Sequence, residues 1–151
     1  MGALLNDLNE QQREAVVHGE GPLLVSAGAG SGKTRVLTYR IAHLLDSGAA
    51  DSSEITAVTF TNKAAKEMRE RVEALLGRPL YGGFVGTFHR WALEILRRWP
   101  HSAGLPKRFG IADADDQRAM MQRALKDLGL DPKEHPPRMV LSRISGMVNR
   151  G

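Results

Sequence analysis

The sequence predicts an α/β fold, in which a parallel sheet with flanking helices is followed by an all-helical, partial subdomain. Apolar runs at 22–26, 55–60 and 84–87 have the composition of short strands, and a segment of helical periodicity follows each of them. Strands that alternate with helices favour a parallel sheet with helices on its faces. Beyond about Pro100 only helical patterns occur, which indicates a second subdomain.

The three predicted strands differ in composition. The first, at 22–26, contains Leu23, Leu24 and Val25 in succession, so we expect it to be buried on both faces. The second, at 55–60, is rich in β-branched residues. The third, at 84–87, is short. Together they predict the sheet of the first subdomain.

Helical periodicity predicts six helices, at 9–18, 34–46, 61–76, 91–99, 113–129 and 137–148. Thr61 is expected to cap the third helix, and Gly77 to end it. Three i,i+4 ion pairs are expected on the outer face of that helix: Lys66–Glu70, Glu67–Arg71 and Arg69–Glu73. Its inward stripe is expected to consist of Ala64, Ala65, Met68, Val72, Leu75 and Leu76.

Composition excludes several classes of protein. The chain has 151 residues, 42% hydrophobic and 25% charged, which is typical of a globular domain. It contains no cysteine, so disulfides and thiolate metal sites are excluded. No segment is long and apolar enough to span a membrane, and the N-terminus lacks a signal-peptide pattern. We therefore expect a cytoplasmic protein with no membrane partner.

The charge distribution permits a polyanionic partner. The formal net charge is +4, and arginine and lysine gather at 90–108 and 138–150. A solvated basic surface explains these clusters equally well. Charge alone leaves both interpretations open.

Residues 27–34 read Ala-Gly-Ala-Gly-Ser-Gly-Lys-Thr and lie between the first strand and a helix. Glycines let successive backbone N–H groups point at an anion, and the helix adds its positive N-terminal end. Lys33 can reach outer phosphates, and the Thr34 hydroxyl can bind Mg²⁺. Ala27 stands where the strict pattern has glycine. The predicted phosphate site, whose alternative is a glycine turn without ligand, comprises Ala27, Gly28, Ala29, Gly30, Ser31, Gly32, Lys33 and Thr34.

Four motifs occur in order along the chain. They are Leu-Asn-Glu-Gln-Gln at 8–12, the loop at 27–34, Val-Thr-Phe-Thr-Asn-Lys-Ala-Ala-Lys-Glu-Met at 58–68, and Gly-Thr-Phe-His at 86–89. With these motifs the chain resembles the N-terminal part of the superfamily 1 DNA helicases of the bacterial UvrD/Rep/PcrA type. Residues 113–117 also resemble the family's entry into its inserted helical domain. The resemblance covers nearly the whole chain.

The resemblance implies a domain assignment. Residues 1–89 would be the N-terminal part of the RecA-like motor domain 1A, a P-loop NTPase fold, and residues 90–151 the start of the inserted helical domain 1B. A working family member also needs an apolar strand ending in Asp-Glu, and the nearest segment, 109–116, lacks it. We therefore expect a fragment whose sheet is incomplete and whose missing partner is the remainder of the helicase chain.

The resemblance also implies the cofactors, ATP and Mg²⁺. Lys33 and Thr34 would be the catalytic groups of this chain, with Thr34 as the magnesium ligand. Gln12 would bind the adenine edge, since an amide offers both a donor and an acceptor. Arg35 would lie near the nucleotide, or would equally be an exposed helix arginine. A surface glutamine remains the alternative for Gln12.

Single-stranded DNA is the implied partner at the ends of the second and third strands. Open α/β sheets bind ligands at this edge. Phe60 would stack on a base, while the other residues would contact the DNA backbone. The alternatives are a core role for Phe60, a capping role for Thr61 and a structural role for His89. The implied contacts are Phe60, Thr61, Asn62, Lys63, Thr87 and His89.

The function implied for the parent protein is that of an ATP-dependent DNA helicase. It would move along single-stranded DNA with three-prime to five-prime polarity, open duplex–single-strand junctions, and serve DNA repair and replication. The chain alone is expected to have little or no ATPase activity. Two alternatives stay open, a small P-loop kinase and a non-catalytic nucleic-acid-binding P-loop module.

Overall fold

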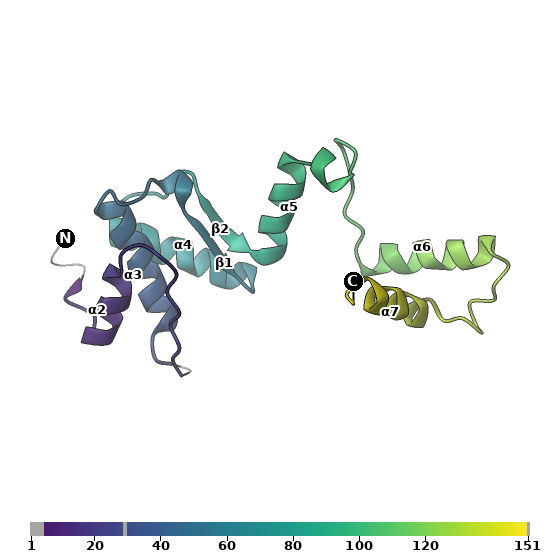
Figure 1. Ribbon diagram of the computed structural model, residues 1–151, viewed down its shortest axis with the longest axis horizontal. Helices are drawn as coiled ribbons and strands as arrows, with labels where there is room; N and C mark the ends of the chain where they lie inside the picture. Colours follow the sequence, from purple (N-terminus) through teal and green to yellow (C-terminus); the bar gives the residue numbers. More distant parts are fainter. Residues whose placement is uncertain (1–4, 29, 151) are drawn as a thin grey trace. The chain divides into compact units, whose positions relative to one another are not determined.

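The computed structural model describes residues 5–28 and 30–150 (Figure 1). These residues form two compact units, which divide between Ala103 and Gly104. The predicted boundary after residue 89 separates domains of the helicase family and not compact units of this chain, so it stays a prediction. Each compact unit is described by itself.

The first unit is an α/β structure, as predicted, with a two-stranded parallel sheet. The strands β1 (Thr56–Thr59) and β2 (Phe84–Thr87) pair in a register that sets Thr56 against Phe84 and Thr59 against Thr87. The helices are α2 (Glu10–Val17), α3 (Lys33–Asp46), α4 (Asn62–Leu76) and α5 (Phe88–Arg98), with short 3₁₀ helices η1 (Ser52–Glu54) and η2 (His101–Ala103).

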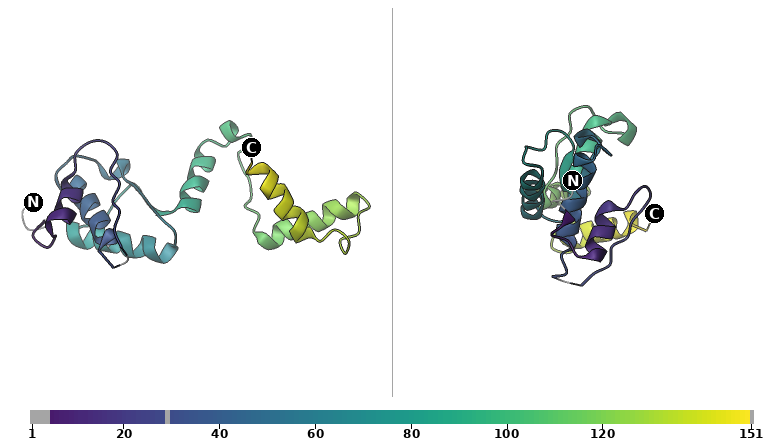
Figure 2. Two further views of the ribbon diagram at one scale, coloured as in Figure 1. Left: turned by 60° about the horizontal axis from the view of Figure 1, so that its bottom comes forward. Right: turned by 90° about the vertical axis from the view of Figure 1, so that its left-hand side faces the viewer.

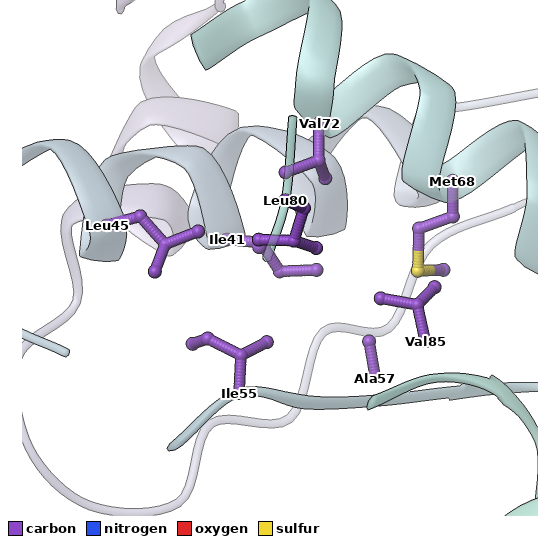
Figure 3. Packing of buried hydrophobic residues seen from close by; sticks show 8 residues of the cluster. All are labelled: Ile41, Leu45, Ile55, Ala57, Met68, Val72, Leu80 and Val85. Atoms are coloured by element: carbon purple, nitrogen blue, oxygen red, sulfur yellow. The ribbon is translucent and has the colours of Figure 1, made fainter. Parts of the chain in front are cut away.

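The core of this unit lies between the sheet and the helices α3 and α4 (Figure 3). Its members come from both helices, both strands and the adjoining loops, and are Ile41, Leu45, Ile55, Ala57, Met68, Val72, Leu80 and Val85. A second cluster joins α2 to α3 through Leu8, Val16, Val36 and Tyr39. The two clusters place α3 at the centre of the unit.

Helix α4 is determined by local sequence signals. The Thr61 hydroxyl accepts a hydrogen bond from the Ala64 N–H at 3.1 Å, and Gly77 ends the helix in the left-handed conformation. The three predicted i,i+4 ion pairs are present at N–O distances of 3.6–3.9 Å. Ala65, Met68 and Val72 are buried, which confirms the predicted inward face.

The prediction of a doubly buried strand at 22–26 is wrong. This segment forms no strand in the structure, and Leu24 is 92% exposed. A strand needs hydrogen bonds from a neighbouring strand. The two described strands, β1 and β2, bond to each other instead. The apolar composition of 22–26 favoured a strand, but composition does not show whether a neighbouring strand is present to pair with it.

The second unit is a helical hairpin of α6 (Ala114–Asp127) and α7 (Pro137–Val148), which pack side by side (Figures 1 and 2). Asp113 caps α6 by accepting from the N–H groups of Asp115 and Asp116 at 2.9 and 2.8 Å. Leu125 is buried, whereas Met147 is 71% exposed. No helix within 5–28 and 30–150 has the length and apolarity to cross a membrane.

Candidate functional site

The glycine loop leads directly into α3, and its last glycine has a conformation that other residues rarely adopt. Gly32 is the N-cap of α3 with φ 90°, and a Cβ on it would lie 2.9 Å from Gln12 Nε2. The Ser31 hydroxyl donates to the Gly28 carbonyl oxygen at 2.7 Å and closes the turn. Ala29 of the predicted site lies outside the described residues.

Lys33 folds back over this loop from the first turn of α3. Its ammonium donates to the carbonyl oxygens of Ala27 and Gly28, each at 2.6 Å. Thr34 follows it and is exposed. A phosphate at the N-terminal end of this 14-residue helix would meet its positive dipole end, the Lys33 ammonium and the Thr34 hydroxyl. The residues present therefore fit a phosphate with a magnesium ion.

Gln12 approaches the same loop from α2. Its Nε2 donates to the Ser31 carbonyl oxygen at 3.2 Å, and its Oε1 accepts from the Asn9 N–H at 3.2 Å. Asn9 and Gln12 form the capping box that starts α2. A glutamine amide has two donors and two acceptor sites, so these bonds leave one of each for a ligand.

Arg35 contacts the segment before α2. Its guanidinium donates to the Asp7 carbonyl oxygen at 2.8 Å, lies 4.0 Å from the Asp7 carboxylate and stands 5.3 Å from the centre of the Tyr39 ring. Part of its donor capacity is thus used within the protein. A nucleotide contact for Arg35 stays a prediction.

The ends of the two strands bring the predicted DNA contacts together. Thr59 and Thr87 are register partners, so the residues that follow them emerge at the same edge of the sheet. Phe60 is 91% exposed, so it is not a core residue of the first unit. Its ring lies 5.6 Å from that of Phe88, centroid to centroid, at an interplanar angle of 46°.

The polar residues at this edge start two helices. Thr61 caps α4, and the Thr87 hydroxyl accepts from the Arg90 N–H at 3.3 Å to cap α5. The predicted contacts Asn62, Lys63 and His89 are exposed in the first turns of these helices. A cleft of about 580 Å³ adjoins them, lined by Asn62, Ala65, Lys66, Arg69, Val85, Gly86, Thr87 and Arg90.

Two residues of interest did not emerge from the sequence reasoning. Phe88 follows the third strand as Phe60 follows the second, and this equivalent placement could have indicated the pair. Arg40 contacts the carbonyl oxygens at the end of α2. No local motif points to it, because its partners lie more than twenty residues away along the chain.

Comparisons with known proteins agree on one family. A sequence model of the UvrD/REP helicase N-terminal domain matches residues 8–150. The chain is 48% identical over 149 residues to the ATP-dependent DNA helicase PcrA of Staphylococcus aureus (strain COL), and 51% identical over 147 residues to that of Leuconostoc citreum. These alignments cover 99% and 97% of this chain and 20% of each relative, so the chain spans about a fifth of their length. The chain therefore belongs to the UvrD/REP helicase N-terminal domain family.

Proposed function

We propose that this chain is the ATP- and single-stranded-DNA-contacting N-terminal part of an ATP-dependent DNA helicase. The observation that carries the proposal is the convergence of Gln12 and Lys33 on the loop at 27–34. The whole protein would act at duplex–single-strand junctions with three-prime to five-prime polarity, in DNA repair or replication in the cytoplasm. Residues 1–89 would belong to its RecA-like domain 1A and 90–151 to domain 1B, and the remainder of the helicase chain would be their partner.

The nucleotide would bind along the loop and the first turn of α3. Lys33 would exchange the Ala27 and Gly28 carbonyl oxygens for phosphate oxygens, which charge-assisted hydrogen bonds favour. Thr34 would hold Mg²⁺, which usually keeps several waters and takes phosphate oxygens besides one or two protein ligands. When bound, the ion neutralises phosphate charge. The remaining donor and acceptor of Gln12 would select adenine, and Arg35 would lie beside it.

We infer little ATPase activity for the chain by itself. Phosphoryl transfer to water needs a group that orients the attacking water and cations that stabilise the transition state. Lys33 and Thr34 supply binding and charge, but no apolar strand ending in Asp-Glu occurs in this sequence.

Single-stranded DNA would lie across the paired strand ends. The exposed rings of Phe60 and Phe88 offer a stacking surface that tolerates any base. Around them, hydroxyl, amide, ammonium and imidazole groups would contact phosphates, which fix the position of the strand without reading its sequence. These backbone contacts would be Thr61, Asn62, Lys63, Thr87 and His89.

A titration with fluorescent ATP and Mg²⁺, competed by ATP and by GTP, tests the nucleotide site. We expect ATP to compete better than GTP, and Lys33→Ala to weaken binding about ten- to a hundredfold, as for a lost hydrogen bond to a charged group. Lys107→Ala removes the same charge from an exposed position and serves as the control. Preference for GTP, or binding that survives Lys33→Ala, would contradict the proposal.

A further inference from the structure

Helix α2 lacks a C-terminal cap of its own. It is eight residues long, has no basic residue in its last turn, and ends at His18, whose φ of −49° and ψ of 131° lie outside the helical region. The last four carbonyl groups of any helix lack partners within it, and a cation near them is favourable. A helix this short is marginal without help from outside. Its end therefore needs an external donor.

Arg40 of α3 provides that donor. Its Nη1 lies 2.8 Å from the His18 carbonyl oxygen and 3.3 Å from those of Ala15 and Val16, and its Nη2 lies 3.5 Å from the Gly19 carbonyl oxygen. One guanidinium thus covers the last turn of α2 and the residues just after it. The planar arrangement of five N–H groups suits an arginine better than a lysine for this role.

Arg40 and Lys33 lie on the same face of α3, because seven positions correspond to about two helical turns. Both line one cleft of about 400 Å³. At the other end of α2, Gln12 is bonded to the Ser31 carbonyl oxygen. Helix α2 is thus fixed to the loop and α3 at two points, Gln12 at its start and Arg40 at its end, with Val16 fully buried between them.

We propose that Arg40 is a positioning residue that clamps the end of α2 to α3 and so holds the Gln12 amide at the loop for base selection. The nucleotide part of this inference rests on the proposed function. The Arg40 guanidinium donates to the end of α2 and to Gly19, so it would act on the ligand through Gln12. Its loss would release the glutamine while leaving the loop and Lys33 in place, so base selectivity would fall and phosphate affinity would not.

Hydrogen exchange of the whole chain tests the clamp without any nucleotide. Arg40→Met removes the donors and keeps an unbranched side chain about as long as the arginine stem. We expect the α2 amides to exchange about tenfold faster or more, as for lost hydrogen bonds to a charged donor, with α4 unchanged. Arg40→Lys should recover part of the protection. Arg71→Met, which removes an exposed ion pair on α4, is the matched control and should leave α2 unchanged.

Two exchange results would overturn the clamp. One is unchanged exchange of α2 in Arg40→Met. The other requires a second variant. If Arg40→Met accelerates exchange throughout the first unit, the exchange of Arg40→Lys distinguishes a local effect from general destabilisation. An increase confined to α2 in the lysine variant supports the clamp, and a uniform increase overturns it.

Competition titrations test base selection. In Arg40→Met the ratio of GTP to ATP dissociation constants should fall to that of Gln12→Ala, while the affinity for tripolyphosphate stays that of the wild type. An unchanged ratio, or an equal loss of tripolyphosphate affinity, would overturn the selective role. If the unmodified chain binds no nucleotide, the proposed function fails, and the exchange measurement still judges the clamp.

Discussion

At the scale of single residues, Phe60 is the clearest case of a side chain whose exposure demands an explanation. Phe60 is 91% exposed, so this large apolar residue gains little burial energy from folding. It nevertheless lies beside Phe88 at the edge where parallel sheets present ligand-binding groups. The position favours a role in binding over one in stability.

Phe60→Ala should weaken single-stranded DNA binding by about 1–3 kcal/mol, the range for removing one base-stacking aromatic. The free energy of unfolding should change by less than about 0.5 kcal/mol, because little is buried. Fluorescence anisotropy with a labelled oligonucleotide and urea unfolding measure the two effects. Tyr81→Ala, an aromatic residue that is 77% exposed elsewhere, is the control. Equal losses from both variants would argue against stacking.

The sequence predicted residues whose role follows from neighbours along the chain. Thr61 could be recognised as a cap because its partner, Ala64, lies three positions later. Arg40 could not, because its partners lie on another helix. Neighbouring residues in the sequence contain no signal for such a long-range contact. They could, however, have indicated that α2 has no basic residue in its last turn.

At the scale of elements, the close approach of η1 to the start of β2 depends on Gly83. This residue has φ +68°, and a Cβ on it would meet the Ile55 carbonyl oxygen at 2.9 Å and the Ser52 carbonyl oxygen closer still. Both oxygens belong to backbone that cannot move away as a flexible side chain can. The first residues of β1 and β2 can pair only because this position has no side chain.

Gly83→Ala should therefore destabilise the first unit by more than Gly77→Ala. Gly77 has a similar φ of +65° but open space around it, so its substitution should cost about 1–2 kcal/mol for the left-handed conformation alone. Urea unfolding of both variants measures the difference. Equal destabilisation would show that the backbone around Ser52 relaxes to admit the Cβ.

Helices were predicted more reliably than strands, and the reason is physical. Helix α7 begins at Pro137 and ends at Val148, as predicted, because its hydrogen bonds and start signal are local. A strand is completed by residues elsewhere in the chain. The run at 22–26 has the right composition but no paired neighbour among the described residues, so it forms no strand and is exposed.

At the scale of the whole molecule, the two compact units differ in how much they bury. The first contains two clusters of buried apolar side chains. In the described part of the second unit, Leu125 alone is buried. Regions with few buried apolar contacts open at lower free energy.

We expect the α6–α7 hairpin to unfold before the first unit. Hydrogen exchange should be faster in α6 and α7 than in α4. Met68→Ala should destabilise the first unit by about 2–5 kcal/mol and leave the exchange of α6 unchanged. Met120→Ala is the control, a Met→Ala change at an α6 position that is 61% exposed, and it should leave the stability of the first unit unchanged. If Met68→Ala accelerates hydrogen exchange in α6 as much as in α4, the two units do not unfold independently.

Lys33 already has partners within the protein, the carbonyl oxygens of Ala27 and Gly28. Phosphate binding as proposed would therefore be a substitution at the ammonium, in which phosphate oxygens replace the carbonyl oxygens. The carbonyl groups would remain close to the ammonium and compete with phosphate for its N–H groups, so they would slow phosphate binding and speed phosphate release. A site built in this way would favour release of phosphate over its retention, since the Lys33 ammonium could return to the carbonyl oxygens when phosphate leaves.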